Sequence, residues 1–512
     1  MLSNAMRALL LAFALITIGN LQCAFAADVD IGASNAVGDR LDIAADTTWS
    51  ASNVYKLHAQ FFVQAGATLT IEAGTKIEAT NPSGSAAPAV IIERGAKIIA
   101  KGTASKPITF TSATAFDYDN LGDTAIADLQ GLWGGLIILG KAPIAGSTDC
   151  DENYDYADAT TYNSDDIEGL PTGATSKYGG CEPDDNSGVL SYVKVWHGGS
   201  EISTGNEING ITLGGVGSGT TIDHIEVAYN LDDGVEFFGG TVNAKYVSVL
   251  FCGDDGVDTD EGYRGKLQYV FIMLGSNSNR AMEMDGKLDG SDAILEPRSF
   301  PQVYNLLIVG GDSDTPSSHS SETLEGLVHL REGTGGIFKN VILANTPLVG
   351  VHQDKCTAET RSTSTEPDIT LYNYDYADLY WSKNNIIHLG NGANTGGNTL
   401  VNFDLDSAGA PFTDCTGFGA SDARNEDPTL MSLPNNALET LTFIDPRPEP
   451  GTSNPAFNNL DDIPDDGFFD QVTFKGAFGT DLWLAGWSML SERKLIPDNV
   501  MPDEILKGDI TA

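Results

Sequence analysis

The sequence predicts an all-β protein, a right-handed parallel β-helix (solenoid) with capped ends and long polar loop insertions. Three observations predict this fold: a repeated motif, alternation of apolar and polar residues within each copy, and frequent Gly and Asp turns. With 57 glycines and 41% hydrophobic residues among 512, the composition is that of a large β-protein with many tight turns. The repeats show no helical periodicity, which excludes helical solenoids.

The clearest repeat joins a short strand, an Asp-Asp-Gly turn and a second short strand. One copy spans residues 222–236 and the next spans 244–258, an offset of 22 residues. Looser copies lie at 269–286 and 303–333. A unit of this length cannot bury its own apolar side, so successive copies must stack as parallel strands about 4.8 Å apart.

The start of the chain differs from the repeats. Arg7, the apolar run after it and the small residues Ala24 and Ala26 are typical of a signal peptide. This predicts export to the extracellular medium, the cell surface or the periplasm, and no later stretch is long and apolar enough to predict a transmembrane segment. We therefore expect a signal peptide (1–26), an N-terminal cap (27–60), a parallel β-helix with disulfide-tied insertions (61–467) and a C-terminal cap and tail (468–512).

The formal net charge of −43 at pH 7 bears on the partner. It argues against nucleic acid, because nucleic-acid binding depends on Lys and Arg side chains that neutralise phosphates. An excess of acids on this scale favours divalent cations. The alternative is that the acids form a solvated surface that keeps a large β-protein soluble.

Five cysteines follow the predicted signal peptide, and an exported protein can oxidise them. Cys150 and Cys181 bracket one Tyr/Asp-rich segment, and Cys356 and Cys415 bracket another. We expect two disulfides that close these loops, with Cys252 free in the core. The sequence leaves the connectivity open.

Alignment of the repeats predicts two columns of polar side chains on one face of the solenoid. The first column holds Glu236, Asp258, Glu283 and His329, and the second, two residues on, holds Phe238, Asp260, Asp285 and Arg331. Stacked carboxylates repel one another unless something lies between them. One hypothesis is a calcium site made by Asp258, Asp260, Glu283 and Asp285. The alternatives are an ion-pair ladder on a solvated face, or part of a catalytic or sugar-binding groove.

An enzymatic interpretation would use the same face. Paired carboxylates can serve glycoside hydrolysis, and a basic side chain with calcium can serve a polysaccharide lyase. The candidate catalytic residues for such an enzyme are Asp254, Asp258, Arg264, Lys266 and Glu283. Asp-Asp-Gly is, however, also an ordinary turn sequence, and we favour the turn.

Aromatic residues in the two cysteine-bracketed loops give another route to binding. They alternate with Asp in a pattern that suits stacking on sugars or contact with a protein partner, although solvated loops would look the same. The candidate ligand-binding residues are Tyr154, Tyr156, Tyr372, Tyr374 and Trp381.

Several glycine-rich motifs recur in order along the chain. They are Gly-Leu-Trp-Gly-Gly at 131–135, the stretches 209–219, 232–240 and 258–265, and Phe-Lys-Gly-Ala-Phe-Gly at 474–479. In these the chain resembles a widespread family of exported, mostly uncharacterised bacterial right-handed parallel β-helix (pectin-lyase-like) surface or secreted proteins. The resemblance implies the fold and a location outside the cytoplasm, and it supplies no catalytic residues.

The sequence thus favours a non-catalytic surface or matrix binding or adhesion protein that depends on a divalent cation. Calcium is the expected cofactor, and a polysaccharide or cell-surface protein is the expected partner. Two alternatives stay open: a polysaccharide lyase or glycoside hydrolase acting on a β-helix face, and a structural component of a surface layer.

Overall fold

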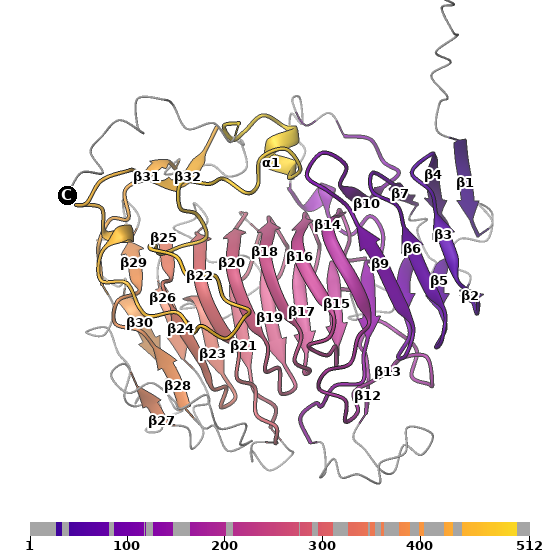
Figure 1. The fold of residues 1–512 in the computed structure, drawn as a ribbon, viewed down its shortest axis with the longest axis horizontal. Helices are drawn as coiled ribbons and strands as arrows, with labels where there is room; N and C mark the ends of the chain where they lie inside the picture. The colour runs from indigo at the N-terminus through magenta and orange to yellow at the C-terminus, as the bar shows by residue number, and fades with distance from the viewer. Residues whose placement is uncertain are drawn as a thin grey trace, which may run out of the picture.

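The computed structural model describes residues 27–32, 40–80, 87–116, 118, 126–146, 164–200, 208–275, 277–288, 295–310, 326–346, 349–353, 360–362, 378–389, 399–403, 424–433 and 443–498. Within these ranges the chain winds into a right-handed parallel β-helix, so the predicted fold class is confirmed. The coils follow one another along the long axis of the molecule, from the indigo strands at one end to the orange strands at the other (Figure 1).

One sheet, here called sheet B, takes a single strand from each coil. Its eleven strands in the described residues pair in parallel. They are β2 (Arg40–Ile43), β5 (Gln60–Val63), β8 (Ala89–Ile92), β11 (Leu136–Leu139), β15 (Ile211–Gly214), β17 (Val235–Phe238), β19 (Val257–Asp260), β21 (Met282–Asp285), β23 (Gly326–Arg331), β26 (Val349–Gln353) and β30 (Thr399–Phe403).

The other large sheet, sheet A, has 17 strands in the described residues. They are β1 (Ala27–Ile31), β3 (Thr47–Trp49), β4 (Asn53–Leu57), β6 (Thr68–Ile71), β7 (Lys76–Ala79), β9 (Lys97–Lys101), β10 (Ile108–Ser112), β14 (Gly188–Trp196), β16 (Thr221–Ala228), β18 (Asn243–Leu250), β20 (Lys266–Met273), β22 (Gln302–Val309), β24 (Gly336–Lys339), β25 (Ile342–Thr346), β27 (Thr360–Ser362), β28 (Asp378–Trp381) and β29 (Ile386–Leu389).

The five long strands of sheet A each bend at one residue in the left-handed region, with φ between 51° and 60°. The bend residues are Tyr192, His224, Tyr246, Tyr269 and Asn305. Strand pairing is interrupted there; for example, Ser191 pairs with Asp223 and Val193 with Ile225, while Tyr192 and His224 between them are unpaired. The bends fold sheet A into two ladders that enclose the core together with sheet B.

Alternation along the strands separates the core from the outer faces. In β17, Val235 and Phe237 point into the main core, and Val257 and Met282 continue that layer in the next coils. Each such side chain contributes about 1.5–3 kcal/mol when fully buried. The residues between them, including Glu236 and Asp258, point to the outer face of sheet B.

Part of the insertion at 145–187 covers that outer face. Its described end carries the two-residue strands β12 (Asp165–Asp166) and β13 (Lys177–Tyr178), which pair antiparallel. Ile167, Leu170 and Tyr178 pack there in a second apolar cluster that includes Phe238 of β17. The Tyr178 and Phe238 rings meet edge to face, with 6.0 Å between their centroids.

The C-terminal segment 443–498 lies along the side of the solenoid, on the outer face of sheet A (Figure 1, yellow). It contains β32 (Asp445–Pro448), which pairs with β31 (Leu430–Ser432), the short 3-10 helix Pro455–Phe457 and helix α1 (Met489–Glu492). A further 3-10 turn spans Ile126–Leu129. Within the described part of the predicted C-terminal cap, residues 468–498, Trp and Phe side chains pack against the bent strands of sheet A.

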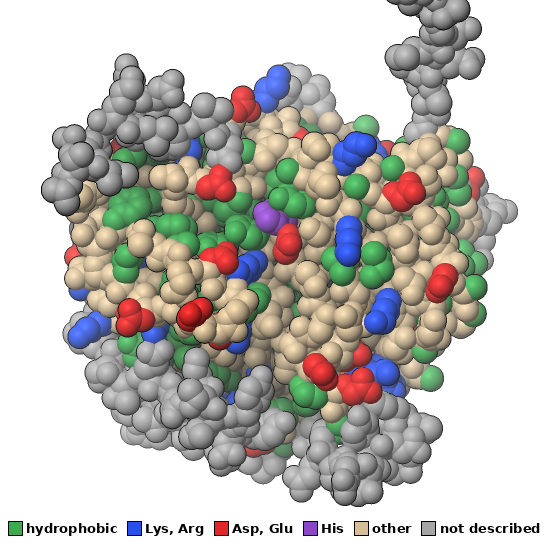
Figure 2. All heavy atoms as spheres, in the orientation of Figure 1, with side chains coloured by type: hydrophobic (Ala, Val, Ile, Leu, Met, Phe, Trp, Pro, Cys, Tyr) green, Lys and Arg blue, Asp and Glu red, His purple; other side chains and the backbone are tan. Residues whose placement is uncertain are grey.

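The predicted N-terminal cap contributes strands to the solenoid. Its strands β1 and β2 pair in parallel with β4 and β5. On the face in Figure 2, acidic and basic side chains are interspersed over the described residues rather than separated by sign. No helix in the described part of the chain is long and apolar enough to cross a membrane.

Cys252 is free and buried, as predicted. Cys181 is buried. Cys150, Cys356 and Cys415 lie outside the described residues, so the two disulfide pairings stay predictions.

Candidate metal centre

The Asp-Asp-Gly sequences form turns that lead into sheet B. Asp233 Oδ1 accepts a hydrogen bond from the backbone N–H of Asp255 at 2.8 Å, and Asp255 Oδ1 accepts one from the N–H of Arg280 at 2.6 Å. Glycine is required after them, because a Cβ on Gly234 would lie 2.5 Å from the carbonyl oxygen of Gly256 in the next coil. The turn interpretation is therefore confirmed, and the turns bring carboxylates of successive coils together.

The predicted column of polar residues exists on the outer face of sheet B. Glu236 pairs with Asp258, Asp258 with Glu283, Glu283 with His329, and His329 with His352. Every member is at least nine-tenths buried, with Asp258 and Glu283 each 8% exposed. The column is therefore buried, whereas one of the alternatives placed an ion-pair ladder on a solvated face.

Two groups of carboxylates meet at Asp258. Asp233, Glu236 and Asp258 each offer an oxygen within 4.8 Å of the others, and so do Asp255, Asp258 and Glu283. We call the first group the carboxylate cluster. Asp232, Asp233 and Asp254 form a third group that extends it toward the surface.

Within the second group, Glu283 is neutralised by basic side chains. Arg280 Nη1 lies 2.7 Å from Glu283 Oε1 and 3.7 Å from Asp255 Oδ2. Burial acts to raise the pKa of Glu283, but the hydrogen bond from His329 Nδ1 at 3.1 Å and the charges of Arg280 and Arg331 outweigh it and lower that pKa. This end of the column is an ion-pair network, as one of the alternatives predicted.

The carboxylate cluster has no such neutralisation. None of its three acids forms an ion pair within the described residues. Burial, followed by the charges of neighbouring carboxylates, raises the pKa of all three well above the usual range. Glu236 Oε2 accepts a hydrogen bond from Asn209 Nδ2, which also donates to Glu168 Oε1 at 2.9 Å. Asp258 Oδ1 is buried and has no hydrogen-bond partner among the residues that the structure describes.

The cluster fits a hard divalent cation. Calcium takes carboxylate oxygens at about 2.3–2.6 Å, so two of its ligands can lie up to about 5 Å apart. The 4.8 Å limit within the cluster meets that requirement. A buried carboxylate oxygen without a donor is also what an ion would satisfy. Asp233, Glu236 and Asp258 would then be the ligands.

The residues predicted to bind a metal fall in different environments. Asp258 and Glu283 share the second group, whereas Asp285 is held by Arg331, whose Nε lies 2.7 and 2.6 Å from its two oxygens. Asp260 Oδ1 accepts the N–H of Glu261. Asp233 was not predicted as a metal ligand, because Asp-Asp-Gly was interpreted as a turn. The recurrence of the same sequence one repeat later, with Asp255 in the place of Asp233, was a signal that could have identified it.

Of the candidate catalytic residues, Asp258 and Glu283 lie together in the second group, but the structure does not bring Lys266 to them. Asp254 Oδ1 accepts a hydrogen bond from Asn279 Nδ2 at 2.8 Å at the edge of sheet B. Lys266 begins β20 in sheet A, where its ammonium pairs with Asp466 of the C-terminal segment. The Arg264 guanidinium lies 6.0 Å from the centroid of the Phe300 ring.

Of the aromatic residues predicted to bind a ligand, only Trp381 lies within the described residues. Trp381 is fully buried in β28 and stacks on Phe338 at 5.5 Å, so it is a core residue and its assignment to a binding loop was wrong. It alternates with polar neighbours because it lies on a strand. Tyr154, Tyr156, Tyr372 and Tyr374 lie outside the described residues.

Comparison with known proteins agrees with the fold. A family model described as a pectate-lyase-like β-helix domain matches residues 41–408. No curated protein and no solved structure matches the chain. Because the matched region covers more than half of the 512 residues and coincides with the stacked coils, the chain belongs to the pectate-lyase-like β-helix domain family.

Proposed function

We propose that the protein is an exported, non-catalytic surface or matrix binding protein that depends on a divalent cation, with calcium the expected ion. The observation that carries the proposal is the carboxylate cluster. Its three buried acids have no ion-pair partner in the described residues, and one of their oxygens, Asp258 Oδ1, accepts no hydrogen bond from any of those residues. A polysaccharide or cell-surface protein is the expected partner.

The cation would act on the shape of the outer face of sheet B. Asp233 lies in the turn before β17, Glu236 lies in β17, and Asp258 lies in β19. An ion held by all three would neutralise their mutual repulsion and tie two successive coils together. Since Asn209 links Glu236 to Glu168, the same ion would also fix the insertion that covers the sheet.

The enzymatic alternative has less support. A lyase or hydrolase on this face needs free acidic and basic groups beside an open groove. Glu283 forms ion pairs with Arg280, His329 and Arg331. Lys266 lies on sheet A, where it pairs with Asp466. The third alternative, a structural component of a surface layer, is favoured by no contact in the described part of the chain.

Thermal unfolding in EDTA and then in excess Ca²⁺ tests the proposal, with Asp258→Asn as the variant. We expect calcium to raise the Tm of the wild type, because an ion that binds only the folded state stabilises it by mass action. In EDTA the variant should be more stable than the wild type, because it removes one of the crowded charges while keeping the shape of the side chain. In calcium that order should reverse.

Asp184→Asn is the matched control, since it removes one negative charge at an exposed position. It should keep the full calcium shift. Equal calcium shifts in the wild type and in Asp258→Asn would contradict the proposal. Release of unsaturated sugar products from a polysaccharide, dependent on calcium and lost in Asp258→Asn, would identify a lyase instead.

A further inference from the structure

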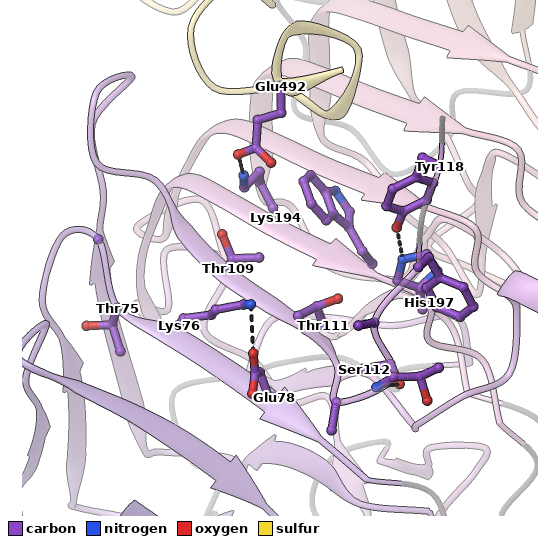
Figure 3. A pocket seen from close by; sticks show the side chains of 16 residues that line it. Thr75, Lys76, Glu78, Thr109, Thr111, Ser112, Tyr118, Lys194, His197 and Glu492 are labelled. Atoms are coloured by element: carbon purple, nitrogen blue, oxygen red, sulfur yellow. Dashed lines mark hydrogen bonds and ion pairs between the residues drawn. The ribbon is translucent and has the colours of Figure 1, made fainter. Parts of the chain in front are cut away.

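A second candidate site lies on sheet A, away from the carboxylate cluster. It is a groove of about 460 Å³ across strands β7, β10 and β14, bordered by residue 492 of helix α1. Figure 3 shows its floor and walls. The volume is within the range of about 300–1,000 Å³ that small-molecule sites occupy.

The strand register builds the floor of the groove. Lys76 pairs with Thr109, and Thr109 pairs with Lys194, so these three side chains form one row across the strands. Glu78 pairs with Thr111 in the row beside it. The two threonines are half-buried, and their hydroxyls have no hydrogen-bond partner among the described residues. They offer the groove two unused donor and acceptor groups.

Two ion pairs flank these hydroxyls (Figure 3). Lys76 Nζ lies 2.7 Å from Glu78 Oε1, and the Lys194 ammonium pairs with the Glu492 carboxylate. Each pair brings together opposite charges, so the lining presents both signs and no net charge. His197 adds none at neutral pH, because burial lowers its pKa to about 4.

Aromatic side chains close one end. Lys194 Nζ lies 4.2 Å from the centroid of the Trp196 ring, and Phe116 and Tyr118 line the same end. The Tyr118 hydroxyl is held by His197 Nε2, which fixes the ring in place. Apolar ring surface beside hydroxyl, ammonium and carboxylate groups matches the mixed polar and apolar surface of a sugar ring.

We propose that this groove binds a neutral saccharide. Hydroxyls of the sugar would accept hydrogen bonds from Lys76, donate to Glu78 and Glu492, and bond to the threonine hydroxyls, while the buried Lys194 holds Glu492 in place. A uronate or other acidic sugar is disfavoured, because both lysines already have carboxylate partners and the whole chain carries a net charge of −43. The site does not depend on the proposed cation, since its residues come from the other sheet.

Isothermal titration of the full chain with neutral tetrasaccharides of glucose, mannose, galactose and xylose tests this proposal, with tetragalacturonate as the acidic probe. At least one neutral probe should bind more tightly than tetragalacturonate, in calcium and in EDTA alike. The double variant Thr109→Val/Thr111→Val keeps the shape of both side chains and removes both hydroxyls. It should weaken that binding by at least about tenfold.

Thr70→Val is the control, because Thr70 is a half-buried outward residue of sheet A outside the groove. It should leave the affinity unchanged. The proposal is overturned if no neutral probe binds, if tetragalacturonate binds more tightly, or if the double variant binds as the wild type does. If calcium does not raise the Tm of the wild type but the neutral sugar still binds, only the cation proposal is refuted.

Discussion

At the scale of single residues, Glu226 links the C-terminal segment to the solenoid. It is fully buried, and its carboxylate accepts hydrogen bonds from Met489 N at 2.7 Å, Trp196 Nε1 at 3.1 Å and Ser248 Oγ at 3.1 Å. Burial nevertheless raises its pKa from 4.5 to about 7. The folded state therefore binds a proton between these two pH values that the unfolded state has released.

This shift predicts how Glu226→Gln alters the pH dependence of stability. In the wild type, the contribution of this group is fully present below about pH 4.5 and is lost as the pH rises through about 7. The loss is about 3 kcal/mol. Glu226→Gln cannot ionise, so its Tm should match the wild type at pH 4.5 and exceed it at pH 8. Thermal melts across this range measure the difference, and parallel profiles for the two proteins would contradict it.

At the scale of elements, the bends of sheet A carry a column of stacked rings. The ring of His224 lies 4.2 Å from each of the rings of Tyr192 and Tyr246, and Tyr269 continues the stack at 4.7 Å. Side chains rarely adopt the positive φ of these bends. Stacking, together with contact to Trp483 and Trp487, offsets that strain and holds the C-terminal segment against the sheet.

Paired substitutions at Tyr246 should separate the strain from the stacking. Tyr246→Ala loses the stack but keeps a Cβ at φ 57°, whereas Tyr246→Gly loses the stack and relieves the strain. We expect the Gly variant to be the more stable of the two by about 1 kcal/mol. At Lys245, in ordinary extended backbone, the order should be the usual one, with Ala more stable than Gly. Chemical denaturation measures both pairs, and the same order at both positions would refute the strain argument.

At the scale of the whole molecule, the charge should govern the response to salt. A net charge of −43 destabilises the compact state through self-repulsion. Raising NaCl from 0.01 to 0.1 M shortens the screening length from about 30 to about 10 Å. With EDTA present throughout, the Tm should therefore rise with NaCl in both the wild type and Asp258→Asn. A Tm that falls or stays constant would mean that local ion pairs outweigh the net repulsion.

The candidate site was predicted only in part, for a physical reason. The column Glu236, Asp258, Glu283 and His329 could be placed because side chains alternate strictly along a strand and the repeats have a fixed offset. The burial of this column could not be predicted, because it depends on contacts with residues that are distant in the sequence. Asp233 was not predicted as a ligand because the repeat shows that Asp recurs in the turn, but not that its carboxylate points toward the neighbouring coil.

The sequence by itself determined the fold class, the stacking of coils and the register of the polar column, because these follow from local periodicity and a repeat length. Only the tertiary structure decided which surfaces of the solenoid are covered. Lys194 meets Glu492 and Lys266 meets Asp466 across gaps of 298 and 200 residues. Such contacts depend on where the C-terminal segment docks, and that docking is decided by the apolar surface of the assembled sheet, which exists only after the coils have stacked.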